Sequence, residues 1–192
     1  MAAEHAAGRA FAEAAGTPAD APWVADVDAQ VHRLDQAARM RWPRVQLDVA
    51  AFAAHLGARV GQPTDVLAAL GTLHPTDLFL ACACAQQDPA ALRAFDREYL
   101  QSLGRMLARL NPPRVIVEDV AQHLRDRLLL ATADRPPGIS KYGGRGKLAG
   151  FIKVVAMREA MARLQRRAPT DEPEEVAKLA APGHDPEFDL MR

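Results

Sequence analysis

Residues 88–110 read DPAALRAFDREYLQSLGRMLARL, and this stretch carries the most regular helical pattern in the chain. Asp88 is a favourable N-cap and Pro89 a favourable first helical residue, so the sequence predicts that a helix begins here. Residues that recur every three or four positions share one side, with Asp96 as the only charge among them: Leu92, Phe95, Asp96, Tyr99, Leu103, Met106 and Leu110. Asn111-Pro112-Pro113 ends this helix and starts another, which we expect to run to about Leu130.

The remainder of the chain has a similar helical character. Alanine is frequent, aromatic residues make up only 5% of the chain, and no stretch alternates apolar and polar residues as a strand would. Further helices are predicted at residues 23–41, from Asp48 onward, at 64–70, at 77–85 with Thr76 as N-cap, and at 147–167. Residues 134–146 hold two prolines and four glycines and are predicted to form a loop. The predicted fold class is therefore all-α, a compact helical bundle.

Charge and composition divide the chain into segments. The formal net charge is zero, but residues 141–167 carry eight cations against Glu159 alone, and the segment that follows is acidic. Such asymmetry indicates a segment that faces a polyanion, next to an acidic tail. We predict disorder for residues 1–22, an N-terminal helical extension at 23–75, the main helical domain at 76–167, and an acidic, proline-rich linker at 168–192.

The sequence gives no support for an enzyme, a metal site or a cofactor. The six histidines are scattered, and the run from Gly143 to Lys147 lacks the spacing and the Ser/Thr of a phosphate-binding loop. Cys82 and Cys84 have neither metal nor disulfide spacing, which favours buried thiols in a reducing cytoplasm. No apolar run approaches a membrane span and no secretory signal is recognisable, so a cytoplasmic protein without membrane contact is predicted.

Two helices suggest binding surfaces. In the helix at 113–130 the predicted buried stripe is Val117, Val120, Ala121, Leu124 and Leu128. Asp119, Gln122 and Asp126 lie on the opposite face with His123 beside them, which fits either a solvated face or a docking surface for a basic partner. In the last helix the predicted core stripe is Val154, Met157, Met161 and Leu164.

The other side of that last helix is basic, with Lys153, Arg163 and Arg167, and with Arg158 on a flank. Together with Tyr142 in the preceding loop, this combination of cations and an aromatic ring is typical of single-strand binding. The alternative is that the cations near the helix end only complement the helix dipole.

Three segments in order resemble region 2 of sigma-70 family transcription initiation factors, especially the extracytoplasmic-function group. They are DLFLACACAQQDPAALRAFDREYL at 77–100, EDVAQHL at 118–124 and YGGRGKLAGFIKVVAMREAMARLQRR at 142–167. The resemblance covers about half of the chain and implies a sigma region 2 helical bundle. The additional helices at 23–75 resemble the N-terminal extension of a myxobacterial subgroup.

The resemblance implies a non-enzymatic factor that binds core RNA polymerase and opens the promoter −10 element. It assigns polymerase binding, on the coiled coil of the largest subunit, to Asp119, Gln122, His123, Arg125 and Asp126. It assigns the non-template single strand of promoter DNA to Lys141, Tyr142, Arg145, Lys147, Phe151, Lys153, Arg158 and Arg163. It also admits an anti-sigma factor as a partner.

The chain departs from the family pattern at several positions. Arg125 replaces an apolar or aromatic residue of the docking helix, Phe151 replaces a tryptophan, and Arg158 matches a position often held by asparagine. The helix-turn-helix of region 4 would be expected to follow near Arg192 and is not in this chain, so the natural protein either continues or lacks it. The alternative function is a helical regulatory protein with a sigma-like fold that binds polymerase or another partner without opening promoters.

Overall fold

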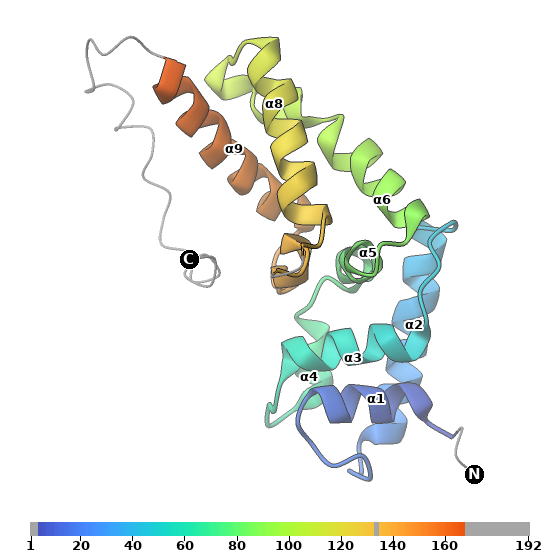
Figure 1. Cartoon of the computed structure of the whole chain (residues 1–192). Coiled ribbons are helices and arrows are strands. Elements are labelled where there is room, and N and C mark those ends of the chain that lie inside the picture. Colours follow the sequence, from blue (N-terminus) through green and yellow to red (C-terminus); the bar gives the residue numbers. More distant parts are fainter. Residues whose placement is uncertain (1–3, 133–134, 168–192) are drawn as a thin grey trace.

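The computed structural model describes residues 4–132 and 135–167, and within these ranges the chain is built from helices (Figure 1). The N-terminal part contains α1 (Ala6–Ala14), α2 (Val24–Arg41), α3 (Val49–Val60) and α4 (Val66–Gly71). It is followed by α5 (Pro75–Ala85), α6 (Pro89–Phe95), α7 (Leu103–Met106), α8 (Arg114–Leu124) and α9 (Leu148–Arg167). No β-strand occurs in the described ranges, so the predicted all-α class is confirmed.

The N-caps confirm several of the predicted helix starts. Asp48, Asp65 and Asp88 each accept a hydrogen bond from a backbone N–H three residues later, at 2.9, 2.9 and 2.7 Å. Such a bond satisfies one of the free donors in the first turn. The prediction for α5 was wrong in one detail, because its N-cap is His74 and its first residue is Pro75 rather than Asp77.

The prediction of disorder for residues 1–22 was wrong for Ala6–Ala14, which form α1. Phe11 is fully buried in this helix and its ring contacts that of Trp23 edge-on, with centroids 6.1 Å apart. Two glycines permit the close packing of α1: a Cβ on Gly57 of α3 would lie 2.2 Å from the carbonyl oxygen of Phe11, and one on Gly8 would lie 2.3 Å from that of Val24. An alanine-rich segment is helix-forming once such a surface covers it.

The helix predicted from Pro89 to Leu110 is interrupted. After α6 the chain forms a π-helical turn (Asp96–Leu100), and a 3-10 turn (Ala108–Leu110) follows α7. The Ser102 hydroxyl donates to the carbonyl oxygens of Glu98 and Tyr99 at 3.0 and 2.9 Å, and this side-chain competition accompanies the break. A second π-helical turn (Arg125–Leu129) likewise follows α8.

The core runs without a gap from the N-terminal helices to α9. Figure 1 shows α5 between the group α1–α4 and the group α6–α9. The rings of Phe52 in α3 and Phe79 in α5 contact each other edge-on at 5.3 Å, and the indole N–H of Trp42 donates to the carbonyl oxygen of Thr76 at 3.1 Å. The predicted boundary between residues 75 and 76 is therefore crossed by one shared core.

The predicted core stripe of the last helix is not its most buried side, although Met157 and Leu164 of that stripe do pack against the core. The residues of α9 that are buried are Leu148, Ile152, Ala156 and Ala160, whereas Val154, Met157, Met161 and Leu164 are half-buried. Both sets have helical spacing, and the small alanines permit close packing between α9 and α8, which lie side by side in Figure 1. In α8, Val120 and Leu124 are buried as predicted, together with Ile116.

No helix in the described part of the chain combines the length and the apolar character that a bilayer crossing requires.

Candidate functional site

The α8–α9 pair and the loop between them position the predicted site residues. On α8, Gln122 is exposed opposite the buried stripe, as predicted, and so is Asp126 in the π-helical turn that follows, whereas Asp119 is exposed on the side towards α9. The amide of Gln122 donates to Asp126 Oδ1 at 2.9 Å, while its oxygen accepts from Arg125 Nη1 at 2.9 Å. These three side chains are thus ordered by one another before any partner binds.

Arg125 extends this polar chain to the π-helical turn after α6. Its Nη2 donates to Asp96 Oδ1 at 2.5 Å, and this hydrogen bond lowers the pKa of the Asp96 carboxyl. Asp96 was the single charge on the apolar side of the segment at 88–110, and Arg125 was the charged departure from the family pattern. The structure pairs the two, so each has a role inside the fold.

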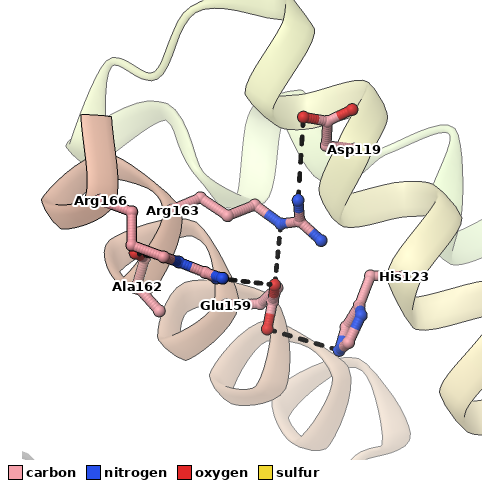
Figure 2. Close-up of polar contacts among 6 residues, drawn as sticks. All are labelled: Asp119, His123, Glu159, Ala162, Arg163 and Arg166. Atoms are coloured by element: carbon pink, nitrogen blue, oxygen red, sulfur yellow. Dashed lines mark hydrogen bonds and ion pairs between the residues drawn. The ribbon is translucent and has the colours of Figure 1, made fainter.

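His123 and Asp119 lie next to α9 and its charged residues (Figure 2). Glu159, whose side chain is 15% exposed, lies at the centre of this group, which we call the Glu159 cluster: Asp119, His123, Glu159, Arg163 and Arg166. Arg163 Nε is 2.8 Å from Glu159 Oε1, and Arg166 Nη2 is 3.8 Å from the same oxygen. His123 Nε2 is 3.4 Å from Glu159 Oε2, without hydrogen-bond geometry, and forms an ion pair there only when it is protonated.

The structure places Arg163 elsewhere than predicted. Its side chain is 26% exposed, and its Nη1 lies 3.8 Å from Asp119 Oδ2 on α8. Arg163 follows Ala156 and Ala160 by seven and three residues, so it shares their side of the helix. The prediction that it faces outward, away from the core stripe, was wrong.

Exposed cations do occur around the start of α9. Lys141, Arg145, Lys147, Lys153 and Arg158 are all exposed. Among the described residues, no acidic side chain lies within ion-pair distance of Arg145, Lys147 or Lys153. These three cations therefore keep their full charge available to an anionic ligand.

The loop that carries these cations is fixed to α5. The N–H of Leu148, the first residue of α9, donates to Asp77 Oδ2 at 2.8 Å, so a carboxylate from α5 caps α9. The N–H of His74 donates to the carbonyl oxygen of Gly144 at 2.7 Å. Gly144 has φ +78° and a Cβ there would lie 2.4 Å from Leu78 Cδ1, so only glycine fits this contact.

Tyr142 does not have the exposed ring that the sequence interpretation required. It is 1% exposed, its hydroxyl donates to the carbonyl oxygen of Gly146, and its ring packs on that of Phe151 with centroids 5.7 Å apart. The prediction that Tyr142 stacks on an unpaired base is wrong for this conformation. Phe151 is half-buried and keeps part of its surface accessible.

Arg59 of α3 is a residue that the sequence did not reveal. Its Nε donates to the carbonyl oxygen of Tyr142 at 3.0 Å and its Nη2 to that of Ser140 at 2.7 Å. Its Nη1 donates to the carbonyl oxygen of His55 at 2.9 Å, and burial lowers the pKa of the guanidinium. The N-terminal helices thus hold the loop that precedes α9. The contacting residues are more than 80 positions apart, and no sequence pattern predicts the contact.

The two cysteines are free and buried, as predicted. Burial raises the pKa of the Cys82 thiol to about 11 and that of Cys84 to about 12, so neither is a reactive thiolate near neutral pH. In the part of the chain that the structure describes, no three His, Cys, Asp or Glu side chains gather as metal ligands would.

Comparison with known proteins gives no match: none of the family models, none of the curated proteins and none of the solved structures matches this chain.

Proposed function

We propose that this chain is a transcription initiation factor of the sigma-70 type, which binds core RNA polymerase through α8 and the unpaired promoter strand through the loop before α9 and the outer side of α9. The observation that supports the proposal best is the placement of charge. A polar, acidic face lies on α8, and exposed cations without an acidic partner among the described residues lie at Arg145 and Lys147 in the loop before α9 and at Lys153 on α9.

The α8 surface suits a basic helix of a partner. Gln122 and Asp126 are exposed and held by hydrogen bonds, so docking would order few side chains. A rim of carboxylates mainly steers association with a cationic partner and sets its orientation. In this assignment Arg125 acts as a support for Gln122, because its Nη2 is already bound to Asp96.

The DNA surface depends on cations more than on stacking. Lysine and arginine side chains that neutralise phosphates supply affinity without sequence preference. Base recognition then falls to Phe151, Arg145 and Arg158, because Tyr142 is buried. Unstacking a base costs a few kcal/mol, which stacking on Phe151 and the arginine planes would have to offset.

The buried ring of Tyr142 favours a second candidate function. With one stacking group fewer, the chain could bind polymerase or another partner without opening promoters, as a helical regulatory protein.

Two assays with purified core polymerase separate these functions. In a pull-down, the initiation factor and a regulatory protein that acts on polymerase both predict binding, and Gln122→Ala with Asp126→Lys should weaken it while leaving the circular dichroism unchanged. In run-off transcription from −10 element libraries, only the initiation factor yields promoter-dependent transcripts. Absence of binding to core would contradict the initiation factor and leave only a regulatory protein that binds another partner. Binding without transcripts would leave the regulatory protein that binds polymerase.

A further inference from the structure

A pocket of about 300 Å³ lies between the end of α2 with the turn that follows it and the side of α6 that continues to Arg97. We call it the arginine pocket. Its lining combines apolar side chains with four arginines: Arg41, Trp42, Pro43, Arg44, Val45, Ala90, Arg93, Ala94 and Arg97. A neighbouring pocket of about 490 Å³ shares Arg93 and Arg97, and its other lining residues are Leu92, Asp96, Gln101, Arg125, Leu129 and Leu130.

Among the described residues, the charges of the arginine pocket have few acidic partners. Arg41 Nη2 is paired with Glu98 Oε1 at 2.8 Å and its guanidinium lies 4.3 Å from the centre of the Trp42 ring. No acidic side chain in residues 4–132 and 135–167 is within ion-pair distance of Arg44, Arg93 or Arg97. Like charges held together repel each other, so an anionic ligand would stabilise this arrangement.

The residues that line the arginine pocket indicate what kind of anionic ligand it can bind. Trp42 is 4% exposed and Arg41 covers its face, so the pocket offers no ring on which a nucleic-acid base could stack. The small side chains of Ala90 and Ala94 leave apolar space beside the guanidinium groups. An apolar side chain flanked by carboxylates matches this pocket, because arginine binds carboxylates with two parallel hydrogen bonds.

The chain itself contains such a segment. Glu187, Phe188 and Asp189 alternate acidic and aromatic residues within the acidic segment at 168–192. We propose that this segment binds the arginine pocket, with Phe188 against the alanines and the two carboxylates on Arg44, Arg93 and Arg97. The contact is independent of the proposed function, since it involves neither α8 nor the cations around α9.

The length of the segment permits the contact. Phe188 lies 21 residues beyond Arg167, the last residue that the structure describes. An extended chain of that length spans at most about 75 Å, whereas a folded domain of this size has a radius of gyration of about 16 Å. Attachment to the same chain gives an effective concentration that can approach the millimolar range, so weak pairing suffices.

Paramagnetic relaxation in the full chain tests the proposal. A nitroxide placed at Met191→Cys is selective, because Cys82 and Cys84 are buried and burial raises the pKa of both thiols. We expect the amide signals of Val45, Ala90 and Ala94 to be broadened most. The broadening should be lost when the arginines are neutralised in Arg93→Gln/Arg97→Gln, and when the acids are reversed in Glu187→Lys/Asp189→Lys. It should return when both sides are reversed, by combining Glu187→Lys/Asp189→Lys with Arg93→Glu/Arg97→Glu.

The matched control is Arg145→Gln/Lys153→Gln, which removes two exposed cations outside the arginine pocket and should leave the pocket broadening intact. Three outcomes would overturn the proposal. They are broadening centred on residues 143–158, equal broadening in the pocket variant and the control, and no broadening at all. Mixing spin-labelled chains with isotope-labelled chains that carry no nitroxide tests the connectivity. If the nitroxide on one chain broadens the pocket signals of another chain, the segment binds between chains, and the proposal of binding within one chain is overturned.

Discussion

Arg163 Nη1 on α9 lies 3.8 Å from Asp119 Oδ2 on α8 (Figure 2). The sequence interpretation assigned Arg163 to DNA and Asp119 to polymerase. The structure instead brings both side chains to the seam between the two helices, where Glu159 holds Arg163 at 2.8 Å. Whatever binds Asp119 from outside must therefore compete with an internal cation.

The first prediction is that Glu159→Ala destabilises the fold more than Arg163→Ala does. Removing Glu159 leaves His123, Arg163 and Arg166 without their shared carboxylate at a side chain that is only 15% exposed. We expect a loss of about 1–3 kcal/mol for Glu159→Ala and about 1 kcal/mol or less for Arg163→Ala. Urea unfolding measures both, with Lys153→Ala as an exposed control. Equal effects of all three would show that the cluster does not hold the helices together.

The second prediction concerns glycines with opposite surroundings. Gly57→Ala should be strongly destabilising, because the new Cβ would meet the Phe11 carbonyl oxygen at 2.2 Å and separate α1 from α3. Gly150→Ala in α9 meets no atom within 4 Å and should stabilise the helix by about 0.5–1 kcal/mol. Thermal unfolding followed by circular dichroism compares the two variants. A tolerated Gly57→Ala would contradict the packing of α1.

The sequence predicted the helices better than it predicted their faces. Asp48 and Asp88 were recognisable as N-caps because capping is local chemistry. The face of α9 was mistaken because large apolar residues at one helical spacing outweighed Ile152, Ala156 and Ala160 at another. Which of two such stripes is buried depends on the helix that packs against α9.

The candidate site was predictable in its exposed charges and not in its long-range contacts. Gln122, Arg145 and Lys153 are exposed as expected, since each lies off its helix's buried stripe or in the glycine-rich loop. Tyr142 and Arg59 could not be placed, because the loop that carries Tyr142 is held at its backbone carbonyl by a guanidinium from α3. No local pattern encodes such a contact.

The third prediction is acid sensitivity that depends on His55. Burial, together with the nearby Arg59 cation, lowers the pKa of His55 from 6.5 to about 3. Between these values the unfolded chain binds a proton at His55 that the folded chain does not, so the free energy of unfolding should fall as the pH is lowered from about 6.5 towards 4. His55→Gln should reduce this slope. Urea titrations from pH 7 to 4.5, above the range in which Asp96 contributes, measure it, and identical slopes would contradict the burial of His55.

The fourth prediction separates a DNA contact from a structural contact on one helix, and it rests on the proposed function. Lys153 and Arg163 both belong to α9, but Lys153 is exposed and has no acidic partner among the described residues, whereas Arg163 faces Glu159 and Asp119. Each phosphate neutralised on a single strand contributes about −0.7 to the slope of log affinity against log salt concentration. In a complex with core polymerase on a fluorescent fork-junction template, Lys153→Ala should therefore reduce that slope by about 0.7 and weaken cognate and scrambled strands alike. Arg163→Ala should leave the slope unchanged, because its cation is already paired within the protein. A reduced slope for Arg163→Ala would restore its assignment to DNA. An unchanged slope for Lys153→Ala would show that the outer side of α9 does not contact the single strand.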